Sequence, residues 1–296
     1  MIQIFNYGQV DRDQIFARVV PEMDVEAIVS QIIADVCKGK DKAVIEYCRR
    51  FDRVDLRNLE VTKEEIAEAK AQVTPEFLEI LRKAAENIRQ YHEKQVCTGF
   101  QMEKDGIILG QKVTPIENVG IYVPGGTAAY PSTVLMDSIP AKIAGCKQIV
   151  MVTPPGKDGK VNPAILAAAD VAGVDRIFKV GGAQAVAALA YGTESIPQVD
   201  KIVGPGNAFV AEAKKQVFGR VAIDMIAGPS EILIVADSLS DPKHIAADML
   251  SQAEHDKLAS AVLVTDSETL AKAVQVELEA KSRHCPEQRL PAIPSM

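Results

Sequence analysis

The chain has 296 residues, of which 47% are hydrophobic and 25% charged, a balance that excludes a disordered or fibrous protein and allows about two domains. Its formal net charge of −7 and the absence of a dense lysine and arginine run argue against non-specific binding to nucleic acid, which needs a basic surface. Its apolar runs are shorter than the roughly 18 residues of a membrane-spanning helix, and its first residues do not resemble a signal peptide. We therefore expect a soluble, cytoplasmic protein with no membrane contact.

The five cysteines are scattered, odd in number and without a C-x-x-C pair. A disulfide framework or a structural zinc site needs closer, paired spacing, so we interpret them as reduced thiols. Cys146, near a predicted helix end, is the one cysteine considered as a nucleophile, and the pattern favours a packing role for it.

The first part of the chain, to about residue 110, is predicted to be helical and charged. Apolar residues recur at helical spacing, and Thr62 followed by Glu65 has the pattern of a capping box. Thr74 is positioned to cap the next helix, whose wide apolar face suits either an arm that contacts a partner or a plain cap on a core. The predicted helical segments are 25–38, 41–50, a helix opening at 63, and 75–94.

From about residue 116, short β-branched runs alternate with Ala- and Leu-rich segments of helical period. The predicted strands are 120–123, 148–153, 176–180, 201–203, 232–236 and 261–264. The predicted helices are 133–143, 164–172, 185–191, 209–218, 243–253 and 267–280. This alternation is typical of parallel β–α–β units, so we predict an α/β fold: a Rossmann-like parallel sheet with helices on both faces, preceded by a helical N-terminal region.

Four parts follow from this pattern. Residues 1–115 form the helical N-terminal region and the start of a first domain, and residues 116–229 form the Rossmann-like central domain. Residues 230–280 return into the first domain as a second α/β half-domain, which we expect to be incomplete because no strand follows its last helix. Residues 281–296 contain three prolines and no period, and we expect an irregular tail there.

Three glycine-bearing turns, at 124–127, 181–184 and 204–207, each follow a predicted strand and precede a predicted helix. Glycine lets the backbone approach a ligand, and the following helix N-termini offer free N–H groups to anions. Because parallel strands end at one edge of a sheet, the turns indicate a binding crevice at that edge. The usual nucleotide signatures are missing, since Phe209 stands where the dinucleotide fingerprint needs Gly or Ala, and no P-loop pattern is present.

Two polar sites have less specific patterns. Ser230 precedes a predicted strand, where it can contact a ligand or satisfy a local turn. Gln252 and His255 are three residues apart and share one helical face, an arrangement that can chelate a metal. A lone histidine in the last turn of a helix more often interacts with the helix dipole, so both interpretations stay open.

Taken in order, the sequence motifs resemble those of the histidinol dehydrogenase family over residues 1 to about 280. The motifs are Gly120-Ile121-Tyr122-Val123-Pro124-Gly125-Gly126, Ser132-Thr133-Val134-Leu135-Met136, Val180-Gly181-Gly182-Ala183-Gln184-Ala185, Gly204-Pro205-Gly206-Asn207-Ala208-Phe209-Val210, Ile223-Asp224-Met225-Ile226-Ala227-Gly228-Pro229-Ser230-Glu231 and Ser251-Gln252-Ala253-Glu254-His255. They follow the order of the family and lie near its spacing, which makes the resemblance specific.

The resemblance implies a zinc-dependent, NAD-linked enzyme that oxidises the small molecule L-histidinol to L-histidine through L-histidinal, the final steps of histidine biosynthesis. It also implies a homodimer. The family positions that contact the cofactor match Tyr122, Gln184 and Asn207. The positions that contact the substrate match Ser230, Gln252 and His255, and the last two of these match zinc ligands.

The family pattern continues beyond position 296, where it brings a Glu-His pair that acts as acid and base, together with two more zinc ligands. No catalytic residue is therefore assigned to this chain. Two interpretations stay open: an active histidinol dehydrogenase, and a catalytically inactive, truncated remnant that keeps a weak dinucleotide-binding crevice. The second interpretation predicts that zinc is bound weakly.

Overall fold

The computed structural model describes residues 3–11, 13, 25–125, 129–226, 231–254 and 259–282. Ser230, His255, the turn residues 126–128 and the predicted tail from residue 283 lie outside the described residues. The contacts divide the chain into two units, Asp24–Ala227 and a second unit made of Met1–Met23 with Gly228–Met296. The predicted four-part division of the chain stays a prediction.

The Asp24–Ala227 unit contains a five-stranded parallel sheet with the strand order β5-β4-β3-β6-β7. The strands are β3 (Asn118–Tyr122), β4 (Gln148–Thr153), β5 (Arg176–Lys179), β6 (Lys201–Val203) and β7 (Ala222–Ile223). The first four confirm the predicted strands. β7 was missed because a strand of two residues is too short to show the alternation of apolar and polar residues that identifies a strand. The chain starts at β3, adds two strands on one side, and then returns to add two on the other, which is the order of dinucleotide-binding sheets.

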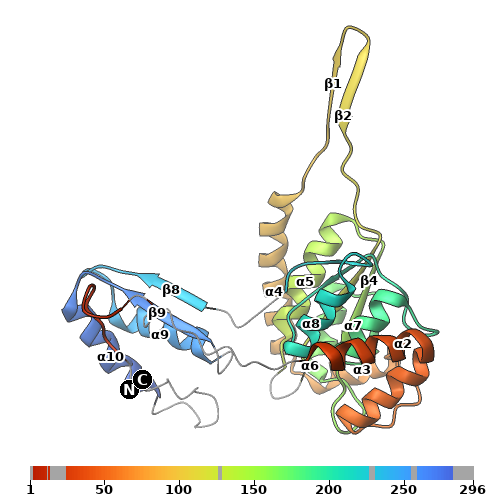
Figure 1. Cartoon of the computed structure of the whole chain (residues 1–296), viewed down its shortest axis with the longest axis horizontal. Helices are drawn as coiled ribbons and strands as arrows, with labels where there is room; N and C mark the ends of the chain where they lie inside the picture. Colours follow the sequence, from red (N-terminus) through yellow and green to blue (C-terminus); the bar gives the residue numbers. More distant parts are fainter. Residues whose placement is uncertain are drawn as a thin grey trace. The chain divides into compact units, whose positions relative to one another are not determined.

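Helices cover both faces of this sheet, as predicted (Figure 1). One face packs against α2 (Glu26–Tyr47), α7 (Gly182–Tyr191) and α8 (Ala208–Val217). The other packs against α3 (Lys63–Gln72), α4 (Pro75–His92), α5 (Pro131–Ala144) and α6 (Pro163–Ala172). Because side chains alternate along a strand, Ile121 of β3 is buried in the second core and its neighbour Tyr122 in the first.

The N-terminal helices begin at the predicted caps. Thr62 and Glu65 form a complete capping box at α3, and the Thr74 hydroxyl accepts a hydrogen bond from the backbone N–H of Phe77 in α4. The apolar face of α4 buries Leu81 and Ala85 against the sheet unit, so this helix caps a core. Two short turns follow the longer helices, η1 (Cys48–Asp52) and η2 (Glu93–Gln95).

The prediction that the chain is helical to about residue 110 was wrong for its last part. Residues there form an antiparallel hairpin of β1 (Phe100–Lys104) and β2 (Ile107–Gln111), which projects away from the sheet (Figure 1). The hairpin turn is Asp105-Gly106, and both residues have positive φ, 52° and 77°. Asp-Gly between two apolar runs is a strong hairpin signal, and it outweighs the surrounding charge pattern.

The described part of the second unit is a parallel pair of strands covered by two helices. The elements are β8 (Glu231–Val235), α9 (Pro242–Ala253), β9 (Ser260–Val264) and α10 (Glu268–Ser282), which confirm the predicted order. Met249 of α9 and Leu270 and Val274 of α10 form its core, while Leu233 and Val235 of β8 are exposed.

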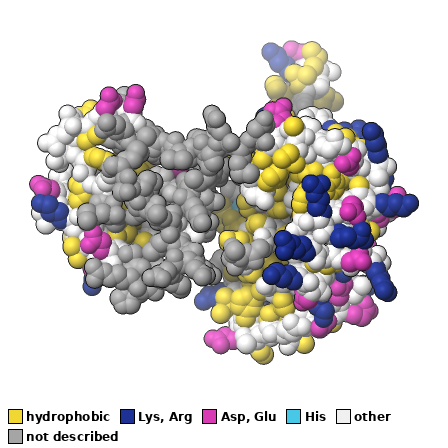
Figure 2. All heavy atoms as spheres, turned by 60° about the horizontal axis from the view of Figure 1, so that its bottom comes forward, with side chains coloured by type: hydrophobic (Ala, Val, Ile, Leu, Met, Phe, Trp, Pro, Cys, Tyr) yellow, Lys and Arg dark blue, Asp and Glu magenta, His cyan; other side chains and the backbone are white. Residues whose placement is uncertain are grey.

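The described surface mixes charges of both signs. On the face drawn in Figure 2, lysine and arginine side chains of the Asp24–Ala227 unit are interspersed with acidic ones. Among the described helices, none combines the length and the apolar composition that crossing a membrane requires.

A close approach between two neighbouring strands fixes one edge of the sheet. Gly204, directly after β6, has φ +113°, and a Cβ atom there would lie 2.2 Å from the carbonyl oxygen of Tyr122 at the end of β3. Real Cβ atoms do not come this close to a backbone oxygen, so the position excludes every residue with a side chain.

We expect Gly204→Ala to destabilise the protein by about 1–3 kcal/mol more than the matched control Gly219→Ala. Gly219 also has positive φ, +95°, but nothing lies within 4 Å of the site of its Cβ, so the control contains the backbone strain without the clash. Denaturant unfolding of the two variants measures the difference. Equal losses would show that the ends of β3 and β6 separate easily.

Candidate functional site

The candidate site lies at the carboxyl edge of the parallel sheet, around the point where the strand order reverses. β3 pairs with β4 on one side and with β6 on the other, so the switch point of the sheet lies between the carboxyl ends of β3 and β6. Open α/β sheets bind their ligands at such a switch point. The crevice predicted from the glycine turns would lie here, between the end of β3 and the turn at Gly204, and it stays a prediction.

Tyr122 ends β3 and joins it to the turn that opens α7. Its hydroxyl accepts a hydrogen bond from the backbone N–H of Gly182 at 3.0 Å. Burial raises the pKa of the phenol to about 12, and the nearby charge of Asp52 also raises it. The phenol therefore stays neutral and retains its proton, which it can donate to a ligand.

Gln184, in the first turn of α7, is buried and has an unpartnered polar atom. Only 1% of the residue is exposed, and its side-chain oxygen accepts no hydrogen bond within the described residues. The turn fits around it because Gly182 has φ +68°, and a Cβ atom there would lie 2.7 Å from this oxygen. A buried acceptor without a donor costs about 1–3 kcal/mol, so a ligand that supplies a donor would recover this energy.

Asn207, after β6, has a structural role in addition to the predicted one. Its Oδ1 accepts a hydrogen bond from the backbone N–H of Val210 at 3.1 Å and so caps α8. The residue is exposed at the edge of the crevice. In contrast, α7 begins at Gly181 without a side-chain cap, so its first turn is better suited to receive an anion.

A charge cluster that the sequence analysis missed, built around the buried Lys214, holds the turn at Gly204. Lys214 of α8 is 1% exposed, donates a hydrogen bond to the carbonyl oxygen of Gly204 at 2.9 Å and pairs with Asp224. Asp224 in turn accepts a hydrogen bond from the Gly204 N–H at 2.9 Å. Both backbone groups of the glycine are thus fixed by one ion pair.

Asp137 of α5 lies beside this cluster and faces the same turn. A Cβ atom on Gly204 would lie 3.1 Å from Oδ2 of Asp137, and this oxygen is buried without a hydrogen-bond partner in the described part of the chain. Burial and the charge of Asp224 raise the pKa of the carboxyl, while the charge of Lys214 lowers it. The net result is a pKa of about 7. The signal in the sequence that could have identified Asp137 is that it is the single acidic residue of the mainly apolar helix α5.

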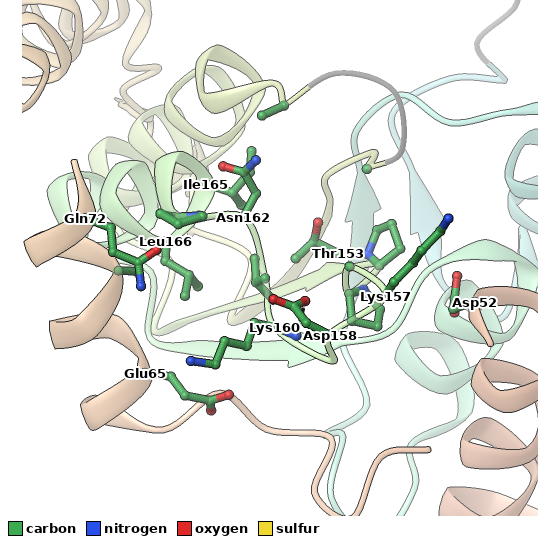
Figure 3. Close-up of a pocket in the computed structure, with 18 of the residues that line it drawn as sticks. Asp52, Glu65, Gln72, Thr153, Lys157, Asp158, Lys160, Asn162, Ile165 and Leu166 are labelled. Carbon is green, nitrogen blue, oxygen red and sulfur yellow. Dashed lines mark hydrogen bonds between the residues drawn. The ribbon is translucent and has the colours of Figure 1, made fainter. Parts of the chain in front are cut away.

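A cavity of about 700 Å³ opens beside the crevice, between the loops after β3 and β4 and the helices α3 and α6 (Figure 3). Pro154 lines this cavity, and Cβ atoms built on Gly125 and Gly181 would both come within 3 Å of its ring. The loops after β3, β4 and β5 therefore pack tightly around this proline. A cavity of this volume is within the range of small-molecule sites.

The remaining predicted residues lie in the second unit or outside the described residues. Gln252, near the end of α9, has a buried side-chain nitrogen without a partner among the described residues. Ser230 and His255 fall outside the described residues, so their predicted roles stay predictions. The described residues contain no group of three His, Cys, Asp or Glu side chains that could hold a metal ion.

Cys146 was considered as a nucleophile, and its surroundings favour a packing role. The thiol packs against the core of the face that carries α5 and α6, and burial raises its pKa. A raised pKa disfavours the thiolate, which is the reactive form.

We expect the stability difference between Asp137→Asn and the unmodified protein to depend on pH. Below about pH 4 the carboxyl is protonated in both the folded and the unfolded chain. Between about pH 4 and 7 the folded protein keeps the proton that the unfolded chain releases, so the stability of the unmodified protein falls as pH rises. The asparagine variant lacks this loss and should gain on the order of 4 kcal/mol relative to the unmodified protein by pH 8.

Chemical unfolding of both proteins from pH 4 to 8 measures this difference. Stability curves that run parallel over the whole range would show that the Asp137 carboxyl ionises as easily in the folded protein as in the unfolded chain.

Comparisons with known proteins agree on one family. The model of the histidinol dehydrogenase family matches residues 18–292, which includes most of the stretch expected to be an irregular tail. The chain is 53% identical to the histidinol dehydrogenase of Clostridium acetobutylicum, over 96% of this chain and 68% of that protein. It is 59% identical to the histidinol dehydrogenase of Geobacillus kaustophilus, over 87% of this chain and 61% of that protein.

The fold gives the same result. The crystal structure of histidinol dehydrogenase from Elizabethkingia anophelis superimposes with a TM-score of 0.88 at 42% identity, and covers 90% of this chain and 62% of that one. The chain spans between 61% and 69% of the length of the curated relatives that it matches. Its sequence, its α/β fold and its strand order together show that the chain belongs to the histidinol dehydrogenase family.

Proposed function

We propose that the chain serves the NAD-linked, zinc-dependent oxidation of L-histidinol to L-histidine through L-histidinal. The observation that carries this proposal is the position of the three residues that match the cofactor contacts of the family. These residues lie at the carboxyl edge of the parallel sheet, beside the switch point where dinucleotides bind in such folds. Tyr122 is the last residue of β3, Gln184 follows β5, and Asn207 follows β6.

The unpartnered groups of the crevice fit a dinucleotide. The buried oxygen of Gln184 lacks a donor, and the first turn of α7 lacks a cap, so a ligand with N–H or O–H donors and an anionic pyrophosphate would satisfy both. When bound, NAD would accept the hydride from the carbinol carbon of the substrate. The neutral Tyr122 hydroxyl would hold the α7 turn in place during binding.

For zinc, we propose Gln252 and His255 as ligands that also position the substrate, with Ser230 as a further substrate contact. The support is the family match over the part of the chain that contains these positions. Because the described residues hold no three-residue metal cluster, we derive no reaction step through the metal. The proposal also includes a homodimer in the cytoplasm, and it includes no nucleic acid or membrane.

A second candidate function is a dinucleotide-binding protein without turnover. It is favoured by the unpartnered oxygen of Gln184 and the uncapped first turn of α7, which suit the binding of a dinucleotide whether or not turnover follows. Both candidates predict NAD binding at the same crevice, so binding experiments test the shared part and turnover separates them.

We expect Gln184→Met and Asn207→Ser to weaken NADH binding about tenfold each. Methionine keeps the volume of Gln184 but removes the amide, and serine keeps a capping oxygen for α8 while removing the amide of Asn207. Gln184→Met should leave the melting temperature unchanged or higher, because it removes an unpartnered buried oxygen. NADH fluorescence titration measures the affinities, and unchanged values in both variants would refute this placement of the cofactor.

The oxidation itself is tested with the purified chain, L-histidinol, NAD and zinc. If the chain is active, NADH forms at a rate that depends on zinc and falls at least a hundredfold in His255→Ala, since a lost first ligand disrupts metal and substrate together. NADH binding without any NADH formation would instead support the second candidate. Metal analysis after dialysis provides an independent measure of whether zinc is retained.

A further inference from the structure

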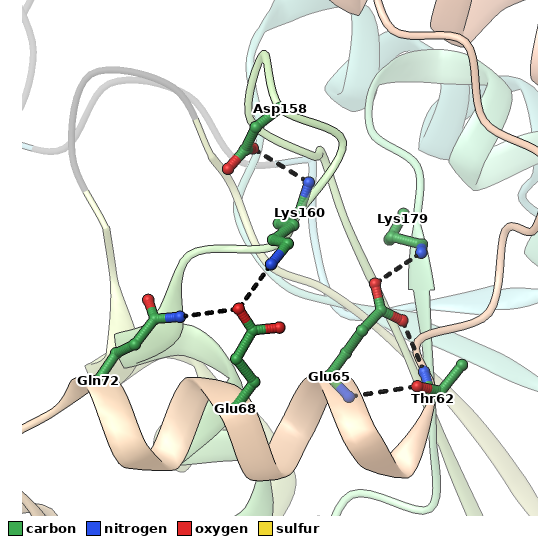
Figure 4. Close-up of polar contacts among 7 residues, drawn as sticks. All are labelled: Thr62, Glu65, Glu68, Gln72, Asp158, Lys160 and Lys179. Carbon is green, nitrogen blue, oxygen red and sulfur yellow. Dashed lines mark hydrogen bonds and ion pairs between the residues drawn. The ribbon is translucent and has the colours of Figure 1, made fainter.

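Four carboxylates line the cavity beside the crevice, and three of them already have partners. Figure 4 shows two of these partnerships on α3. Glu65 pairs with Lys179 at 2.9 Å and also accepts a hydrogen bond from the N–H of Thr62, while Glu68 pairs with Lys160 at 2.6 Å.

The third partnered carboxylate, Asp158, is in the loop after β4. It accepts a hydrogen bond from the backbone N–H of Lys160 at 3.1 Å (Figure 4). These three carboxylates are thus used to hold α3 and the loop after β4 in place. They have little capacity left for a ligand.

Asp52 is the fourth carboxylate, and it differs from the others. It ends the η1 turn after α2 and enters the cavity from the side opposite to α3 (Figure 3). Its Oδ2 is buried and accepts no hydrogen bond within the described residues, while the carboxyl also interacts with the thiol of Cys48. Burial raises the pKa of Asp52, so the ionised group lacks the donors that would solvate it.

Asp52 also lies at the end of the cavity that adjoins the cofactor residues. Its charge raises the pKa of Tyr122, whose hydroxyl holds the α7 turn. The cavity wall continues from Asp52 to Gly125, in the loop directly after β3. A ligand that occupies the crevice at β3 can therefore extend into the cavity without leaving the Asp24–Ala227 unit.

The strand next to β3 lacks the acid that this fold ordinarily uses. In dinucleotide-binding sheets, an Asp or Glu that follows the first strand by about 20 residues binds the ribose hydroxyls of the adenosine half. Here β4 ends in the buried Thr153, followed by Pro154, whose ring contacts the positions of two glycine turns. The three residues directly after β4 are Pro154, Pro155 and Gly156, which carry no carboxylate, so the same task requires an acid from another element.

We propose that Asp52 accepts hydrogen bonds from the adenosine ribose hydroxyls of the dinucleotide and thereby makes the site select NAD over NADP. This inference rests on the proposed NAD-linked function and adds the residue that sets its cofactor preference. A 2′-phosphate would replace a hydroxyl donor by a dianion facing a buried carboxylate, and both changes oppose binding. Lys157, on the same cavity wall, is available to the pyrophosphate or to a 2′-phosphate once the carboxylate is gone.

The test compares the binding of NADH and NADPH to the whole chain by fluorescence titration, in the unmodified protein and in Asp52→Asn. We expect Asp52→Asn to weaken NADH binding about fivefold to twentyfold and to bring the affinities for NADH and NADPH within about threefold of each other. Asp158→Asn is the matched control, because it removes one negative charge from the same cavity and keeps the oxygen that accepts the Lys160 N–H. It should leave the ratio of the two affinities unchanged.

A second measurement locates the contact on the ribose. ADP and 2′-deoxy-ADP should differ severalfold in affinity for the unmodified protein and hardly at all for Asp52→Asn, since the hydroxyl and the carboxylate are then partners in one interaction. Thermal unfolding of the variants confirms that they fold.

Three outcomes are distinguishable. An altered ratio in Asp52→Asn alone, with loss of the 2′-hydroxyl effect, supports the proposal. Equal ratios in all three proteins, or equal changes in Asp52→Asn and Asp158→Asn, overturn the role of Asp52 while leaving the NAD site intact. If the unmodified chain binds neither NADH nor NADPH, both the proposed function and this inference are refuted.

Discussion

The contact between the end of β3 and the turn after β6 is the constraint on which the crevice depends. Two parallel strands that share hydrogen bonds must diverge beyond their ends before a ligand can enter, yet here the backbone of Gly204 lies against the carbonyl of Tyr122. The absence of a side chain permits this approach, and the ion pair of the buried Lys214 with the more exposed Asp224 fixes both polar groups of the glycine. The loops therefore diverge from one defined point, and the positions of Tyr122 and Asn207 on either side follow from it.

The same edge of the sheet contains groups that reduce the stability of the protein. Gln184 and Asp137 each bury an oxygen that accepts no hydrogen bond within the described residues. Burial also raises the pKa of the Asp137 carboxyl to about 7. A fold selected for stability alone would replace both with apolar side chains of similar volume. Groups of this kind cluster where a ligand is bound, because the ligand provides the missing donors. The folding stability that these groups cost the free protein thus indicates that the site is formed before a ligand binds.

Most of the α/β architecture could be predicted from the sequence, because long amphipathic helices and β-branched strands have clear periods. Thr62 with Glu65 gave the start of α3 correctly, and the strands around Gly120 and Ile149 were placed within two residues. The hairpin at Asp105 was missed although its turn signal was present, since the surrounding charges resembled a helix surface. For the site, the glycine turns lie at the carboxyl edge of the sheet as expected, and the binding site predicted there stays a prediction. The partners of Lys214 were beyond reach, because contacts between separate helices and turns leave no periodic pattern in the sequence.

The failure of the dinucleotide fingerprint at Phe209 can now be explained by the structure. In the usual motif the first glycine permits the tight turn, the second permits close backbone approach, and the third lets the helix pack against the strand. Gly204 fulfils the first role with its positive φ, and the absence of a side chain at Gly206 lets the turn lie close to α8, since a Cβ atom there would lie 2.3 Å from the Val210 side chain. The third role is absent, because Phe209 packs against the core at this position and Asn207 caps the helix with its side chain. A capped helix N-terminus is less available to a pyrophosphate, so we propose the uncapped first turn of α7 for the anion, and the acid proposed for the ribose is Asp52 rather than a residue at the end of β4. The two departures have separate local causes: Phe209 and the side-chain cap of Asn207 shape the turn after β6, whereas prolines occupy the two positions directly after β4.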